Sequence, residues 1–143
     1  MSRLQLALNV DDLEASIAFY STLFGTEPHK IRPGYANFAV AQPPLKLVLI
    51  ENAGHGGSIN HLGVEVADTA GVSEAQQRIA ASGLSGREEA DVVCCHARQD
   101  KVWVNDPDGA AWEVYTITDD NPELSLAMAT DGSADTGSVC CAG

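Results

Sequence analysis

The chain has 143 residues, of which 20 are acidic and 8 are Lys or Arg, so its formal net charge is −12. Because 45% of the residues are hydrophobic and 20% are charged, the composition predicts a folded globule and excludes a disordered chain. The acidity disfavours binding to nucleic acid or to anionic lipid. The chain contains no apolar run long enough to span a membrane and no signal-peptide core, which together predict a soluble cytoplasmic domain.

The first segment, 4–25, predicts a strand followed by a helix. Leucines occupy every second position of the strand, so we expect them to face the helix. The spacing of Asp11 and Glu14 predicts a capping box, and Gly25 stands where the helix would end. The face of the strand opposite the helix is expected to carry Gln5, Ala7 and Asn9.

The segment 60–83 repeats this pattern. Alternation in its strand places His61 and Glu65 on the face opposite the helix. Either Asp68 or Thr69 can cap the helix, and Gly83 is expected to close it. The chain therefore contains two copies of a strand–helix unit.

Three short β-type runs follow each helix, at 29–32, 35–40 and 45–51 and again at 88–94, 101–105 and 110–117. Each copy therefore reads as βαβββ. We expect residues 1–120 to form one α+β domain, with modules at about 3–53 and 58–118 that build a curved mixed sheet. Residues 121–143 are small, polar and acidic, and they predict a flexible tail that carries Cys140 and Cys141.

Strand alternation gathers polar and aromatic side chains on the sheet faces that the helices leave uncovered, and pairing of the two modules would turn these faces into one cleft. An imidazole, a carboxylate and an amide oxygen are suitable ligands for a divalent metal, and the set is close to the facial triad of non-haem iron(II) enzymes. Zinc, manganese and nickel are compatible with the same ligands. The candidate ligands are Gln5, His61 and Glu113, and the side chains that share their face include Lys101, Trp103 and Tyr115.

The four cysteines form two adjacent pairs, Cys94-Cys95 and Cys140-Cys141. Adjacent Cα atoms lie about 3.8 Å apart, below the roughly 4.4–6.8 Å usual for a disulfide, so a bond within a pair would be strained. We expect reduced thiols that bind a soft metal or metalloid, although neither pair matches a four-ligand zinc site. For both sulfurs of the first pair to reach one ligand, the backbone must leave strand geometry there, and the polar sequence HARQD after Cys95 permits a loop.

Together these features resemble the vicinal oxygen chelate superfamily of glyoxalases, bleomycin-resistance proteins and extradiol dioxygenases. The resemblance covers residues 4 to about 117 and rests on the repeated module and on three motifs: NVDDLEASIAFYSTLFG, NHLGVEV with His61, and VNDPDGAAWEVY with Glu113. Within the superfamily, CCHARQDKVWVNDPDGAAWEVYT resembles the organoarsenical carbon–arsenic lyases and the cadmium-induced proteins.

The resemblance implies that Gln5, His61 and Glu113 hold Fe(II), a site that Ni, Co, Mn or Zn could also occupy. It implies that Cys94 and Cys95 bind the arsenic of a trivalent organoarsenical such as methylarsenite. Dioxygen activated by the iron would then attack the carbon–arsenic bond and release arsenite. Strand parity places Trp103, Tyr115 and Lys101 in the pocket wall, and Cys140 and Cys141 are either accessory thiols or part of an idle tail.

Two other functions fit the same residues. A thiol-based cadmium or arsenic binding protein would need the cysteines but not Glu113. A glyoxalase- or epimerase-type metalloenzyme would need a general base besides the metal ligands, and Glu65 lies on the appropriate face. The sequence leaves open a monomer or a homodimer, and a methyl or an aromatic substituent on arsenic.

Overall fold

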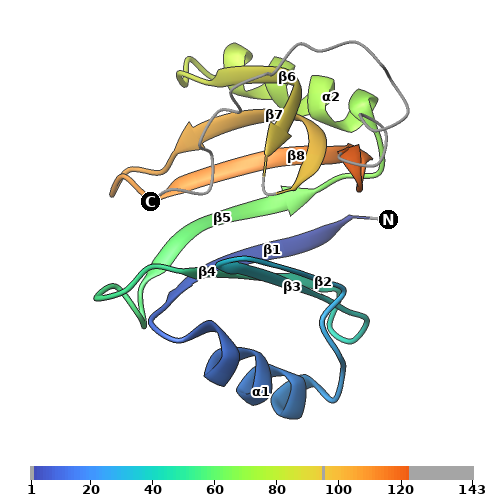
Figure 1. The fold of residues 1–143 in the computed structure, drawn as a ribbon. Helices are drawn as coiled ribbons and strands as arrows, with labels where there is room; N and C mark the ends of the chain where they lie inside the picture. Colours follow the sequence, from blue (N-terminus) through green and yellow to red (C-terminus); the bar gives the residue numbers. More distant parts are fainter. Residues whose placement is uncertain (1, 95, 123–143) are drawn as a thin grey trace, which may run out of the picture. The chain divides into compact units, whose positions relative to one another are not determined.

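The computed structural model describes residues 2–94 and 96–122. Its elements follow the order β–α–β–β–β twice, which confirms the α+β class and the two βαβββ copies (Figure 1). The described chain forms two compact units: the first runs to Val64 and includes Asn105–Trp112, and the second comprises Glu65–Val104 and the chain from Glu113. The predicted tail lies mostly outside the described residues, and no helix within them is long and apolar enough to cross a membrane.

The strands of the first unit form a mixed sheet in the order β2-β3-β4-β1-β5. β1 and β4 are parallel, whereas β3 runs antiparallel to both β2 and β4. β5 opens the second copy in the sequence, yet its residues up to Val64 belong to the first unit, beside β1. The elements are β1 (Arg3–Val10), α1 (Leu13–Phe24), β2 (Lys30–Arg32), β3 (Tyr35–Val40), β4 (Leu45–Glu51) and β5 (Ile59–Glu65).

Helix α1 covers one face of strands β1 to β4 (Figure 1). Its apolar side chains pack on a core that includes Phe38, Leu47 and Leu49, which are less than 2% exposed. Leu6 and Leu8 of β1 join this core as predicted, but Leu4 is 47% exposed. Gln5 and Asn9 alternate with Leu6 and Leu8, so they lie on the other face of β1.

The helix cap differs from the predicted one by one residue. Asp12, in an extended conformation, accepts a hydrogen bond from the backbone amide of Ala15 at 3.0 Å. Asp11 instead accepts from the amides of Gly54 and Gly56 at 2.8 and 3.0 Å, and so ties the start of the helix to the loop after β4. The capping box with Asp11 is therefore wrong, because that carboxylate is engaged by a loop that is remote in sequence.

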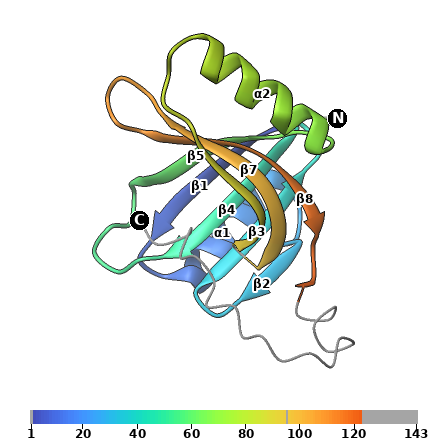
Figure 2. The same ribbon diagram turned by 90° about the horizontal axis from the view of Figure 1, so that it is seen from above.

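The second unit repeats the helix-on-sheet arrangement with the strand order β8-β7-β6. Its core joins Val72 and Ala75 of the helix to Val102 of the sheet. Asp68 caps the helix as predicted, and Gly83 has a positive φ of 81° just after it. β6 and β7 run side by side as a curved antiparallel ribbon (Figure 2). The elements are α2 (Thr69–Ala81), β6 (Arg87–Cys94), β7 (Ala97–Asn105) and β8 (Ala111–Asp119).

The predicted loop after Cys95 is largely absent. β7 begins at Ala97, so the polar residues Arg98, Gln99 and Asp100 belong to a strand that pairs with β6. Arg98 pairs with the Asp91 carboxylate at 3.0 Å, and the Gln99 amide donates to the Cys94 carbonyl at 2.7 Å. These cross-strand contacts stabilise the hairpin, and they explain why a polar sequence is extended here.

Candidate metal and substrate site

The polar residues predicted to be ligands are deeply buried. Gln5 is 3% exposed, His61 4% and Glu113 3%. Gln5 and Glu113 each alternate with a residue that packs against the helix of its own unit, Leu6 and Val114. Buried polar groups need hydrogen-bond or ionic partners. The contacts of these side chains therefore decide which of their atoms could bind a metal.

Gln5 and His61 come together in the first unit from the neighbouring strands β1 and β5. The Gln5 side-chain Nε2 lies 3.2 Å from His61 Nε2, and His61 Nδ1 lies 2.8 Å from Asn60 Oδ1. An amide oxygen can only accept, so His61 Nδ1 carries the ring proton and donates it to Asn60. His61 Nε2 therefore presents a lone pair beside the Gln5 amide.

This arrangement fits a divalent metal. A metal-binding histidine uses one ring nitrogen as ligand while the other donates a hydrogen bond. The Gln5 amide already points at His61 Nε2, and a half-turn of that amide would bring its oxygen to the same place. Among the described residues no three His, Cys, Asp or Glu side chains cluster, and the predicted set contains only two of these residue types.

Glu113 of the second unit forms a buried ion pair. Its Oε2 accepts from the Lys101 ammonium at 2.7 Å, and Lys101 is only 1% exposed. The ammonium also lies 5.3 Å from the centre of the Trp103 ring and 5.8 Å from that of Tyr115. Strand parity predicted this common face but not the ion pair. The sequence feature that could have indicated the ion pair is a lysine and a glutamate on the same face of two strands joined as a hairpin.

Tyr115 connects this cluster to Glu65. The Tyr115 hydroxyl donates to Glu65 Oε2 at 3.1 Å, and Tyr115 is completely buried. The carboxylate of Glu65 is therefore held by a phenol. The epimerase hypothesis assigns a proton-transfer role to this same carboxylate.

Cys94 ends β6, is 3% exposed and is disulfide-bonded, whereas the prediction was a reduced thiol. Cys95, the second residue predicted to bind arsenic, lies outside the described residues, as does the pair Cys140-Cys141. Sequence reasoning missed Gln99, which is 3% exposed, donates to the Cys94 carbonyl and has a buried Oε1 without a hydrogen-bond partner in the described part of the chain. Gln99 lies two residues before Lys101 and so shares its face of β7.

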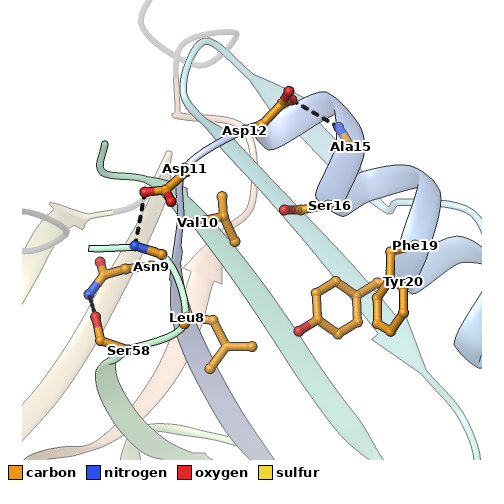
Figure 3. A pocket seen from close by; sticks show the side chains of 12 residues that line it. Leu8, Asn9, Val10, Asp11, Asp12, Ala15, Ser16, Phe19, Tyr20 and Ser58 are labelled. Carbon is orange, nitrogen blue, oxygen red and sulfur yellow. Dashed lines mark hydrogen bonds between the residues drawn. The ribbon is translucent and has the colours of Figure 1, made fainter. Parts of the chain in front are cut away.

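A cavity of about 470 Å³ lies on the other side of β1, between α1 and the loop that precedes β5 (Figure 3). Leu8 and Val10 line it together with Phe19 and Tyr20. These β1 residues alternate with Gln5, so the cavity is distinct from the Gln5–His61 contact on the opposite face of the strand. Asn9 lines its edge and points to Ser58 (Figure 3).

The chain is similar in sequence to known proteins. A sequence profile of the Glyoxalase/Bleomycin resistance protein/Dioxygenase superfamily matches residues 3–114. A Thermomonospora curvata protein named "Trivalent organoarsenical cleaving enzyme" is 58% identical over 142 residues, which cover 99% of this chain and 89% of that protein. A Mycobacterium tuberculosis protein named "Cadmium-induced protein CadI" is 54% identical over 144 residues, which cover 100% of this chain and 95% of that protein.

The fold is also found among solved structures. The 2,3-dioxygenase LapB from Pseudomonas sp. KL28 matches with a TM-score of 0.62 and 20% identity, over 83% of this chain and 42% of that chain. At this level of identity the likeness shows the fold alone.

Proposed function

Since the chain belongs to the Glyoxalase/Bleomycin resistance protein/Dioxygenase superfamily, we propose that it is an Fe(II)-dependent dioxygenase that cleaves the carbon–arsenic bond of trivalent organoarsenicals and releases arsenite. The observation that carries the proposal is the 58% identity to the Thermomonospora curvata enzyme along nearly the whole chain. The donor types of the buried polar residues support it. The proposed substrate is methylarsenite or an aromatic arsenical.

In this proposal Gln5, His61 and Glu113 hold the metal through one imidazole nitrogen, one amide oxygen and one carboxylate oxygen. When bound, Fe(II) would supply the activation of dioxygen, which amino-acid side chains do not provide unaided. For methylarsenite the balanced reaction consumes one dioxygen molecule. One oxygen atom ends on arsenic as arsenite, and the other ends on the carbon, which leaves as formaldehyde.

The thiols of Cys94 and Cys95 are proposed to bind arsenic, which is soft and thiophilic and keeps its carbon substituent on the third position. Cys94 is disulfide-bonded in this structure, so this part of the proposal concerns the reduced protein. A cytoplasmic location, which the sequence predicts, would keep these thiols reduced. Lys101, Trp103 and Tyr115 are proposed to line the pocket, and their mutual contacts support one shared face.

The decisive experiment follows arsenite release. Reduced protein loaded with Fe(II) under anaerobic conditions should release no arsenite from methylarsenite until air is admitted, and formaldehyde should form in equal amount. Release of arsenite without metal or without dioxygen would contradict the proposal.

A second candidate function is thiol-based binding of cadmium or arsenic without turnover, and it is favoured by the 54% identity to the protein named as cadmium-induced. This function predicts tight uptake of Cd(II) by the cysteines and no release of arsenite in air. Variants at Glu113 separate the two functions, because they should end turnover and leave thiol binding intact.

A further inference from the structure

A chain of side-chain hydrogen bonds leads away from His61 through the first unit. His61 Nδ1 lies 2.8 Å from Asn60 Oδ1, and Asn60 Nδ2 donates to Asn9 Oδ1 at 2.9 Å. Asn9 Nδ2 donates to Ser58 Oγ at 2.9 Å, which Figure 3 shows as a dashed line. The Ser58 hydroxyl in turn donates to the backbone carbonyl of His55 at 2.6 Å. All members of the chain therefore belong to the end of β1, the start of β5 and the loop between β4 and β5.

The chain has a direction because of its last member. A backbone carbonyl can only accept, so the Ser58 proton points to His55 and the Ser58 oxygen accepts from Asn9. The Asn9 amide is thereby oriented with its oxygen towards Asn60. The Asn60 amide then donates to Asn9 and turns its own oxygen to His61.

Reversing this direction would break several contacts at once. Asn9 Oδ1 also accepts from Asn52 Nδ2 at 3.4 Å. If the Asn9 amide were flipped, its NH₂ group would lie against the NH₂ groups of Asn52 and Asn60, and donors would face donors. The backbone holds the same residues in register, because the Asn9 amide donates to the Ser58 carbonyl at 3.0 Å. Asn9 is 7% exposed, so water has little access to replace a lost partner.

We propose that Asn60 is a positioning residue that, through this chain, keeps the His61 proton on Nδ1 and presents Nε2 to the metal. The proposal rests on the metal site proposed above and extends it to residues outside the ligand set. Such outer partners fix the tautomer and the ring orientation of a ligand, and losing them typically weakens metal affinity about 10–100-fold. Asn9 and Ser58 set the orientation of Asn60 and have smaller expected effects.

The test uses two readouts that do not depend on catalysis. In metal-free reduced protein, ¹⁵N NMR of the imidazole nitrogens should show His61 as the Nδ1–H tautomer. Asn60→Leu removes the acceptor at nearly constant size and should move the proton towards Nε2. Titration with Co(II) alone should then show an affinity about 10–100-fold below that of the wild type.

Matched variants separate positioning from a general loss of polar contacts. Asn60→Asp keeps an acceptor for His61 and should retain the Nδ1–H tautomer and most of the Co(II) affinity. Asn52→Ala removes only the longest contact of Asn9, at 3.4 Å, and leaves its bonds to Asn60 and Ser58, so it should change neither readout. Ser58→Ala removes the link that orients Asn9 and should give a partial tautomer shift. If Asn60→Leu fails to fold in a thermal melt, Ser58→Ala and Asn60→Asp decide.

An unchanged tautomer and an unchanged Co(II) affinity in both Asn60→Leu and Ser58→Ala would overturn the proposal. An equal loss of affinity in Asn60→Asp and Asn60→Leu, without a tautomer shift, would also overturn it. Failure of the proposed function looks different: the wild type would show the Nδ1–H tautomer and would not release arsenite from methylarsenite.

Discussion

The two units hold the proposed metal ligands by different physical means. In the first unit, Gln5 and His61 belong to a neutral network of amides and a hydroxyl that ends on a backbone carbonyl. In the second unit, Glu113 is held by the Lys101 ammonium at 2.7 Å, beside the faces of two aromatic rings. The proposed ligands of the first unit are therefore held by directional hydrogen bonds, and that of the second unit by an ion pair.

The difference matters when one member is lost. Removing one member of a neutral pair leaves a buried donor or acceptor unsatisfied, which typically costs about 1–3 kcal/mol. Removing one partner of a buried ion pair leaves an uncompensated charge in a medium of low polarity, which costs about 3–5 kcal/mol. Single substitutions at the buried ion pair of the second unit should therefore be more destabilising than those in the neutral network of the first.

The largest effect is expected from Glu113→Gln. The substitution removes the proposed carboxylate ligand and leaves the Lys101 ammonium buried without its described counter-ion. We expect arsenite release to fall to background and the free energy of unfolding to fall by about 3–5 kcal/mol. Assays of arsenite release and urea denaturation measure the two effects.

A double variant separates chemistry from stability at this position. Glu113→Gln combined with Lys101→Met removes both charges, and should recover much of the stability lost in either single variant. Activity should stay at background. Recovery of arsenite release in the double variant would contradict the ligand role of Glu113.

Cys94→Ser is expected to have the next largest effect, because the hydroxyl is a poor ligand for arsenic. Binding of methylarsenite, measured by retention of arsenic on the reduced protein, should be lost, and Fe(II) affinity should stay at the wild-type value. Oxidised wild-type protein should behave like the variant until a reductant is added. Binding by oxidised wild-type protein would show that the Cys94 thiol is not needed.

Gln5→Leu probes the neutral half. It removes one proposed ligand and the Nε2 partner of His61. We expect weaker Fe(II) binding in an anaerobic titration, but a loss of only about 1–3 kcal/mol in the free energy of unfolding. A loss as large as that of Glu113→Gln would show that the two halves do not differ as described.

The smallest effect is expected at the two helix caps, whose carboxylates are neither proposed ligands nor members of the hydrogen-bond chain that starts at His61. Asp12→Ala and Asp68→Ala each remove a side-chain acceptor for a first-turn amide. Each should lower the free energy of unfolding by about 1 kcal/mol, measured by thermal or urea denaturation, without changing arsenite release. A larger effect at Asp11, which binds two loop amides, would confirm that its role is not that of a cap.

The order of elements was predictable because local patterns determine it. Apolar alternation, helical spacing and turn residues are properties of short segments, and they placed all eight strands and both helices near their observed bounds. The exceptions have non-local causes. Asp11 is drawn to a loop more than forty residues away, and the polar residues after Cys95 extend because they pair with β6.

The sequence by itself determined the residue types of the candidate site and the strand faces on which they lie, since alternation is a property of each strand alone. Only the tertiary structure decided their partners. Lys101 binds Glu113, Tyr115 binds Glu65, and Asn60 orients His61 through Asn9, because strand pairing and loop folding set distances that no local pattern contains. These partners decide which atom of each side chain is available for chemistry.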